Sequence, residues 1–326
     1  MIRSLPPIRG RVRLGNFFYR LLKINDLNLF IIAKNRDNSR FQFYINSWEG
    51  RLAYFGREYE SSLVDFLLDH CNDKPLLDIG ANVGLITIPF VQRFVTRRPE
   101  IVKKGAMTFP LAYAVEAVEL NFASLKNNIQ LNGFDSLIRP HHVALGACDG
   151  AQVTIHLMED STQYSGTAAI FDETRMDREK YNAPRGPALD LKLKKLDTLI
   201  YAEHRIPADL GIIKMDVDGY ELEILKGASR LLAEGRPVWF AEMCEYSLNW
   251  HGYGIEDVFR HVSPLGYQIW IRHPKRYVFK KWLPGDTFEM DALLIPEERV
   301  EPFNRRLENF PSPPKNVWKS PSYVRG

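Results

Sequence analysis

Residues 76–85 constrain the fold of this chain most strongly, because they combine an apolar run, an acid and two glycines spaced four apart. The apolar run leads into Asp78, and Gly80 and Gly84 follow before an apolar, helix-like pattern begins. Glycine adopts backbone conformations that other residues avoid, and it lets backbone N–H groups approach a ligand closely. The stretch therefore predicts a strand, a tight turn and a helix start that together bind a nucleotide-like ligand.

The composition indicates a globular protein, since 45% of the 326 residues are hydrophobic and 25% are charged. A formal net charge of +3 is too small an excess to indicate a phosphate-binding surface, so no nucleic-acid partner is expected. Cys71, Cys148 and Cys244 are far apart and lack metal-ligand spacing, which argues against a disulfide scaffold or a zinc site. A reducing, cytoplasmic location is expected. No apolar run approaches the roughly 20 residues of a membrane helix.

Three regions are expected along the chain. Residues 1–72 form a basic arm, a hairpin with strands near 41–45 and 51–55, and a helix near 60–71. Residues 73–300 form the main domain. Residues 301–326 contain five prolines and no periodic pattern, so this tail should wrap the surface or stay mobile.

Five arginines precede the first acid of the chain, Asp26, and apolar residues separate them. These arginines are Arg3, Arg9, Arg11, Arg13 and Arg20. Two interpretations stay open for this basic arm. It contacts the anionic lipids of a membrane surface, which would make the protein peripheral, or it forms a helix that packs on the domain with solvated arginines.

Apolar runs and helical patterns alternate through the main domain, which predicts a parallel sheet with crossover helices. Strands are expected at 76–79, 111–116, 137–145, 210–215 and 237–243, and helices at 85–94, 121–131 and 220–232. An acid stands at or just after the end of four of these strands: Asp78, Glu116, Asp216 and Glu242. Because ligands bind at the carboxyl ends of parallel strands, the four acids should surround one site.

The glycine turn differs from the turn of dinucleotide-binding enzymes, which has three glycines in the order G-x-G-x-x-G. Asn82 stands at the position of the middle glycine, and the third glycine is absent from its expected place. An acid before a turn with two glycines instead suits a ligand that has a cationic end and a ribose but no pyrophosphate.

The motifs of the main domain resemble those of the FkbM family of S-adenosylmethionine-dependent O-methyltransferases. The resemblance spans roughly residues 51–295, and its motifs are residues 76–85, 113–116, 143–146, 212–221 and 225–228. It implies a class I methyltransferase fold: an α/β, Rossmann-like, mostly parallel seven-stranded sheet with helices on both faces. It also implies S-adenosylmethionine as cofactor and a hydroxyl acceptor on a sugar, a glycolipid, a polysaccharide or another natural product.

The resemblance also implies roles for single residues on the cofactor side. Asp78, Gly80, Asn82 and Gly84 form the cofactor turn, Glu116 accepts hydrogen bonds from the ribose hydroxyls, and Ala144 lies beside the adenine. Capping of the following helices is the alternative for Asp78 and Glu116.

Three residues are candidates for the methyl-transfer step, which needs a group that orients the acceptor hydroxyl and takes its proton. Asp216 is the first candidate and Glu242 the second. His251, in the loop after the strand of Glu242, is the third, with a structural role as its alternative. Asp218 and Glu221 cap or stabilise the helix that follows, or contribute to the same site.

Other functions stay open at this stage. Several acids in one site also suit a divalent cation, although no metal ligand set is assigned. The run Asp216-Val217-Asp218 imitates the metal-binding motif of a glycosyltransferase, but that function leaves the turn and Glu116 unexplained. A non-catalytic module that binds S-adenosylmethionine is the third reading.

Overall fold

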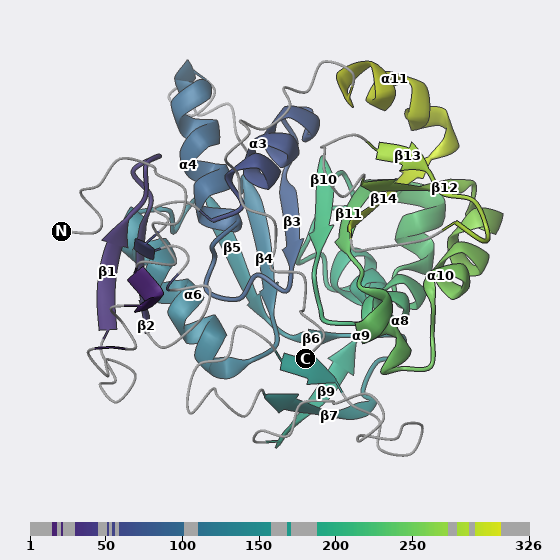
Figure 1. Ribbon diagram of the computed structural model, residues 1–326, viewed down its shortest axis with the longest axis horizontal. Helices are drawn as coiled ribbons and strands as arrows, with labels where there is room; N and C mark the ends of the chain where they lie inside the picture. Colours follow the sequence, from purple (N-terminus) through teal and green to yellow (C-terminus); the bar gives the residue numbers. More distant parts are fainter. Residues whose placement is uncertain are drawn as a thin grey trace.

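The fold is an α/β arrangement in which helices cover both faces of one central sheet (Figure 1). The computed structural model describes residues 15–17, 21, 30–44, 51, 54–55, 59–100, 110–157, 168–170, 188–272, 279–286 and 291–307. The five arginines of the basic arm all lie outside these residues. Within them, no helix is long and apolar enough to cross a membrane.

The central sheet has eight strands in the order β13-β12-β14-β11-β10-β3-β4-β5. Five strands are parallel: β3 (Leu76–Ile79), β4 (Ala112–Glu116), β5 (Ile138–His142), β10 (Ile212–Met215) and β11 (Val238–Glu242). Antiparallel pairing adds β14 (Asp291–Pro296), β12 (Tyr267–Arg272) and β13 (Phe279–Lys281). The expected mostly parallel sheet is confirmed, and the short edge strand β13 brings the number of strands to eight instead of seven.

Two apolar cores lie on the two faces of the sheet and explain why the parallel strands read as unbroken apolar runs. One face carries α3 (Ser61–His70), α4 (Thr87–Arg97) and α6 (Glu119–Asn132). The other face carries α8 (Glu221–Lys226), α9 (Glu245–Asn249) and α10 (Ile255–Val262). Strands β3 and β10 are buried at every position, because they lie between both layers of helices.

Local sequence signals explain where α4 and α6 begin and end. Pro89 lies in the first turn of α4, where its missing N–H has no helical partner to lose. Helix α6 ends at Gly133, which adopts a left-handed conformation with φ 69°. Both helices agree with the sequence expectation to within a few residues.

The segment 137–145, expected as one strand, divides between two sheets. Strand β5 ends at His142, and the Val143 N–H donates to the Glu116 carbonyl at 3.1 Å. Strand β6 (Ala144–Leu145) then joins a separate sheet in the order β6-β9-β7-β8, with β7 (Gln152–Leu157), β8 (Ala168–Ile170) and β9 (Ala188–Lys194). This smaller sheet lies below the central one in Figure 1.

The expected N-terminal hairpin has a different first strand. Strand β2 (Arg40–Tyr44) pairs with β1 (Phe30–Lys34), whereas Arg51, Tyr54 and Phe55 are helical, so the expected strand at 51–55 is wrong. The turn at residues 35–39 decides the pairing. There the Asp37 carboxylate accepts from the Ser39 N–H, and Asn38 adopts a left-handed φ of 73°.

The expected helix at 220–232 is interrupted after α8. The carboxylate of Asp197 accepts the N–H groups of Arg230 and Leu231, and the Gly227 carbonyl accepts the Asp197 N–H. These contacts start a separate π-helical turn at Leu231–Gly235. Asp197 also precedes another π-helical turn, Thr198–Ala202.

The C-terminal part of the described chain is helix α11 (Glu297–Leu307), which includes Pro302. The helix crosses the expected boundary at residue 300, so the proline-rich segment does not start as an irregular tail. The remainder of the expected tail, residues 308–326, lies outside the described residues.

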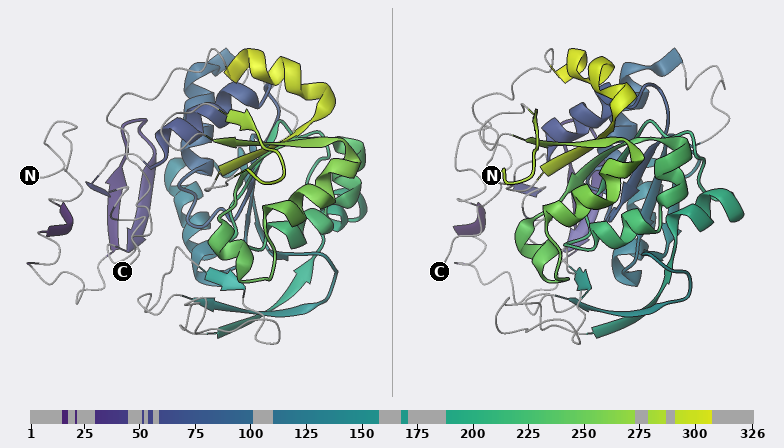
Figure 2. Two further views of the ribbon diagram at one scale, coloured as in Figure 1. Left: turned by 45° about the vertical axis from the view of Figure 1, so that its right-hand side comes forward. Right: turned by 90° about the vertical axis from the view of Figure 1, so that its right-hand side faces the viewer.

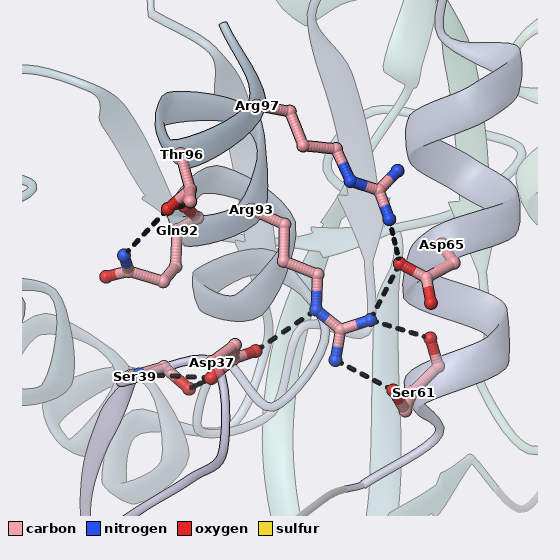
Figure 3. Close-up of polar contacts among 8 residues, drawn as sticks. All are labelled: Asp37, Ser39, Ser61, Asp65, Gln92, Arg93, Thr96 and Arg97. Carbon is pink, nitrogen blue, oxygen red and sulfur yellow. Dashed lines mark hydrogen bonds and ion pairs between the residues drawn. The ribbon is translucent and has the colours of Figure 1, made fainter. Parts of the chain in front are cut away.

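Arg93 of α4 ties the hairpin turn and helix α3 together (Figure 3). Its guanidinium donates to the Asp37 carboxylate at 3.2 Å and to the Ser61 carbonyl and hydroxyl at 2.9 and 2.8 Å. The same group lies 2.9 Å from Asp65. Arg93 therefore fixes the first turn of α3 and, with it, the residue before that turn, Glu60.

Candidate functional site

The candidate site lies at the carboxyl edge of the central sheet, next to β3. Strands β4 and β5 follow on one side of β3, and β10 and β11 on the other, so the strand order reverses between β3 and β10. Ligands of open α/β sheets bind at such a reversal. The four acids predicted from the sequence all stand at this edge, because β3, β4, β10 and β11 are parallel.

The glycine turn is pressed against the neighbouring strands. The N–H groups of Gly80 and Ala81 both donate to the Val115 carbonyl, at 3.0 and 2.9 Å. Gly80 has φ 76°, and a Cβ atom there would lie 1.9 Å from the Asp216 carbonyl oxygen. Only glycine satisfies both conditions. The turn is therefore built around a direct approach of the backbones after β3 and β10.

Gly84 meets a different demand, the packing of α4 on α6. It has φ 92°, and a Cβ atom there would lie 2.9 Å from side-chain atoms of both Ile88 and Leu125. The second glycine of the motif thus serves the helix that follows the turn.

Glu116 links the glycine turn to the start of α6. Its Oε2 accepts the N–H of Asn82 at 2.8 Å, and its Oε1 accepts the N–H of Val118 at 2.9 Å. Burial raises the pKa of the Glu116 carboxyl, while these N–H groups oppose the rise. The side chain of Asn121 also bonds the carboxylate, which leaves about one of its four acceptor sites for a further donor. The capping contact anticipated as an alternative is present, and an acceptor site for a ligand hydroxyl remains.

Asp78 faces the protein interior. It is fully buried, its Oδ2 accepts the hydroxyl of Thr87 at 2.5 Å, and its Oδ1 lies 3.4 Å from the ammonium group of Lys214. The carboxylate therefore supports the turn from beneath. Because Asp78 is buried, it can affect a bound ligand only through Lys214 and the turn.

Lys214 connects the cofactor turn to the opposite side of the site. Its Nζ donates to the Gly80 carbonyl at 3.3 Å and to the Asp216 carboxylate at 3.2 Å. Burial alone lowers the pKa of Lys214, but the charges of Asp216 and Asp78 outweigh burial and raise it above its ordinary value. A buried but charged lysine thus lies between the two halves of the site.

Asp216 and Glu242 bring two carboxylates to adjacent strand ends. The side chain of Asp216 is 35% exposed, so solvent and a substrate can reach it. The charge of Asp216, followed by burial, raises the pKa of Glu242 well above its ordinary value, against the effect of Lys214. This shift favours a protonated Glu242 beside a carboxylate.

The structure adds three charged residues that the sequence did not indicate: Glu60, Arg272 and Asp291. Asp291 begins β14 opposite Glu242, and its Oδ2 lies 2.5 Å from Nε of Arg272. Glu60 precedes α3 in a left-handed conformation with φ 40°. Enclosure by the surrounding protein and the charges of Asp291 and Asp216 raise the pKa of Glu60 to about 7, although part of the residue is open to solvent.

The other two predicted residues are buried. His251 is 7% exposed, and its ring packs edge-on against Tyr220 with the centroids 5.3 Å apart. Ala144, at the start of β6, is also buried. Glu221 begins α8 and accepts the N–H groups of Val217 and Gly219, which supports the turn that follows Asp216.

Within the part of the chain that the structure describes, no group of three or more His, Cys, Asp and Glu side chains is arranged to hold a metal ion.

A model of the methyltransferase FkbM domain matches residues 78–269, which are 192 of the 326 residues. The chain belongs to the FkbM methyltransferase family. The matched residues include the glycine turn, Glu116, the Lys214 connection and Glu242. The fold is accordingly the class I methyltransferase fold.

Solved structures with a similar fold include a methyltransferase FkbM from Methylobacillus flagellatus KT, which is 17% identical with a TM-score of 0.37. That match covers 68% of this chain and 43% of the other. The tRNA (uracil-54, C5)-methyltransferase of Pyrococcus abyssi, solved with S-adenosyl-L-homocysteine, is 13% identical with a TM-score of 0.36, covering 81% and 43%. TYW2 of M. jannaschii, solved with AdoMet, is 14% identical with a TM-score of 0.37, covering 81% and 84%. This chain therefore spans less than half of the first two proteins. No curated protein matches the chain.

Proposed function

We propose that the protein transfers the methyl group of S-adenosylmethionine to an acceptor hydroxyl and releases S-adenosylhomocysteine. The observation that carries this proposal is the Lys214 connection, through which a nucleotide-type turn at Gly80 adjoins an exposed carboxylate at Asp216. An in-line displacement requires the methyl acceptor to lie next to the cofactor. Lys214 contacts both the turn and Asp216, so the two sides of this site adjoin.

The residues at the turn fit S-adenosylmethionine. The Glu116 carboxylate keeps an acceptor site for a ribose hydroxyl, and its bond to the Asn82 N–H ties that site to the glycine turn. In this proposal Ala144 packs beside the adenine; it follows Val143, whose N–H donates to the Glu116 carbonyl. When bound, the cofactor supplies a methyl group on a sulfonium centre.

On the acceptor side, Asp216 orients the hydroxyl and takes its proton as the oxygen attacks. Lys214 holds one oxygen of this carboxylate and leaves the group partly exposed. Glu242, with its raised pKa, donates a hydrogen bond to the acceptor or to Asp216. His251 is buried and packs against Tyr220, so its role in this proposal is to hold Tyr220 in position.

The proposed acceptor is rich in hydroxyl groups, because the exposed carboxylate of Asp216 accepts hydrogen bonds from hydroxyls. A sugar, a glycolipid, a polysaccharide or another natural product meets this requirement. A divalent cation is not needed here, since Lys214 already neutralises part of the acidic charge. The same ion pair disfavours a glycosyltransferase that binds a metal through Asp216 and Asp218.

The experiment that tests this function is incubation of the full chain with methyl-labelled S-adenosylmethionine and a panel of hydroxylated acceptors. The label should enter an acceptor as an alkali-stable ether, and S-adenosylhomocysteine should form in equal amount. Asp216→Asn should reduce the rate about 100-fold or more while binding of S-adenosylmethionine persists. Label in an ester or amine would contradict the hydroxyl acceptor, and binding without turnover across the panel would favour a non-catalytic module.

A further inference from the structure

The N-terminal hairpin presents a face that mixes exposed apolar side chains with cations. Because successive side chains of a strand point to opposite faces, the buried Ala33, Phe41 and Phe43 define the inner face. The opposite face, called the outer hairpin face below, carries Phe30, Ile32 and Lys34 of β1 and Arg40 and Gln42 of β2.

Both apolar residues of the outer hairpin face are strongly exposed: Phe30 is 46% and Ile32 59% accessible. At the other end of the same face, Lys34 lies directly opposite Arg40. The face therefore has an apolar half and a cationic half.

The acid of the hairpin turn does not contribute to this face. Asp37 points toward α4, and its carboxylate accepts from Arg93 of that helix at 3.2 Å (Figure 3). It also accepts from the hydroxyl of Ser39 in the same turn at 2.6 Å. Residues 30–44 contain three cations, Lys34, Arg36 and Arg40, and one acid, Asp37. The charge of the hairpin itself is consequently positive.

The backbone edge of β2 is bonded to α6. The side-chain amide of Asn128 bonds both the N–H and the carbonyl of Gln42, and that of Asn132 bonds both groups of Arg40, at 2.7 to 3.2 Å. Two asparagines four apart thus occupy the hydrogen-bonding edge of β2 as a strand would. In Figure 1 the hairpin lies beside α6, on the left-hand side of the molecule. Figure 2 shows the same hairpin from two further sides.

We propose that the outer hairpin face docks on an anionic lipid membrane, with Phe30 and Ile32 in the headgroup boundary and Lys34 and Arg40 at the lipid phosphates. Apolar side chains gain from burial among acyl chains, and basic residues gain from an anionic surface. A nucleic acid would attract the cations but offer Ile32 no apolar surroundings. A second copy of the chain would bring the Lys34 and Arg40 pairs of two molecules together.

The test is sedimentation of the full chain with vesicles of phosphatidylcholine, with and without about one third phosphatidylserine. Binding to the anionic vesicles is expected, with weaker binding at high salt and little binding to neutral vesicles. Each basic residue at the surface contributes about 1 kcal/mol, a factor of about five. The double variant Lys34→Gln/Arg40→Gln should therefore bind about 30-fold more weakly.

The double variant Phe30→Thr/Ile32→Thr keeps β-forming side chains and should bind about tenfold more weakly. Matched controls lie elsewhere on the surface: Leu283→Thr removes an exposed apolar side chain, and Arg260→Gln removes an exposed cation. Both should bind as the unaltered protein does. Circular dichroism melting of every variant shows that the fold is intact.

Four results would overturn the proposal: no vesicle binding by the unaltered protein, equal binding to neutral and anionic vesicles, unchanged binding by both face variants, or equal loss in the controls. Binding to duplex RNA without vesicle binding would assign the face to nucleic acid. Dimerisation that Phe30→Thr/Ile32→Thr abolishes, without vesicle binding, would assign it to self-association. The readout does not involve methyl transfer, so it stands apart from the proposed reaction.

Discussion

The ammonium group of Lys214 lies 3.2 Å from the carboxylate of Asp216, directly beneath the turn at Gly80. Lys214 also lies 3.4 Å from the fully buried Asp78, so one lysine bridges an interior acid and an exposed one. The bridge couples the two sides of the site. Removing the charge of Lys214 would disturb the turn and the acid that adjoins it.

Lys214→Met keeps the length of the side chain but leaves Asp78 without its counter-charge. Breaking a buried ion pair by removing one partner costs about 3–5 kcal/mol, so the free energy of unfolding in urea should fall by that amount. Lys74→Met is the matched control, because Lys74 pairs with Asp209 at the surface. It should cost no more than about 1 kcal/mol. Equal effects of the two substitutions would contradict the structural role of Lys214.

Gly80→Ala and Gly133→Ala separate backbone strain from steric conflict. Both glycines have positive φ, 76° and 69°, but a Cβ atom at Gly80 would meet the Asp216 carbonyl, whereas one at Gly133 meets nothing within 4 Å. Gly133→Ala should cost about 1 kcal/mol of stability. Gly80→Ala should cost about 4 kcal/mol or more and abolish cofactor binding. Similar melting temperatures for the two variants would refute the close approach at Gly80.

Glu221 should make stability depend on pH. Burial raises the pKa of its carboxyl to about 7, against the effect of the backbone N–H groups that bond it. Between about pH 4.5 and 7 the folded protein therefore binds a proton that the unfolded chain has released, so stability falls as pH rises through this window. Glu221→Gln should flatten this slope.

The control for Glu221→Gln is Glu234→Gln, which removes a charge from an exposed acid. It should leave the slope unchanged. Unfolding curves measured across this range of pH test the assignment, and an identical slope in the unaltered protein and Glu221→Gln would contradict it.

The glycine turn and strands β3, β4, β10 and β11 could be predicted because each is a buried run that ends in an acid. Fully buried parallel strands read as continuous apolar segments, and their carboxyl ends must meet at one edge. The sequence alone therefore predicts that four acids lie at one edge of the sheet: Asp78, Glu116, Asp216 and Glu242.

Glu60 and Asp291 could not be found in this way. Asp291 reaches the site because β14 pairs antiparallel with β11, and Glu60 because Arg93 holds the start of α3 in place. Both depend on contacts between distant segments. Likewise, the sequence shows Lys214 only as one residue of the 212–221 motif, and its role depends on the charges of Asp78 on β3 and Asp216 after its own strand.

The central claim, that the turn and Glu116 bind S-adenosylmethionine, is tested most directly by calorimetric titration. The unaltered protein should bind both S-adenosylmethionine and S-adenosylhomocysteine. Glu116→Ala should weaken both by about 100-fold, because it removes the acceptor of the ribose hydroxyls and the partner of the Asn82 N–H. Unchanged affinity in Glu116→Ala would contradict the ribose assignment, and no binding by the unaltered protein would contradict the proposed function itself.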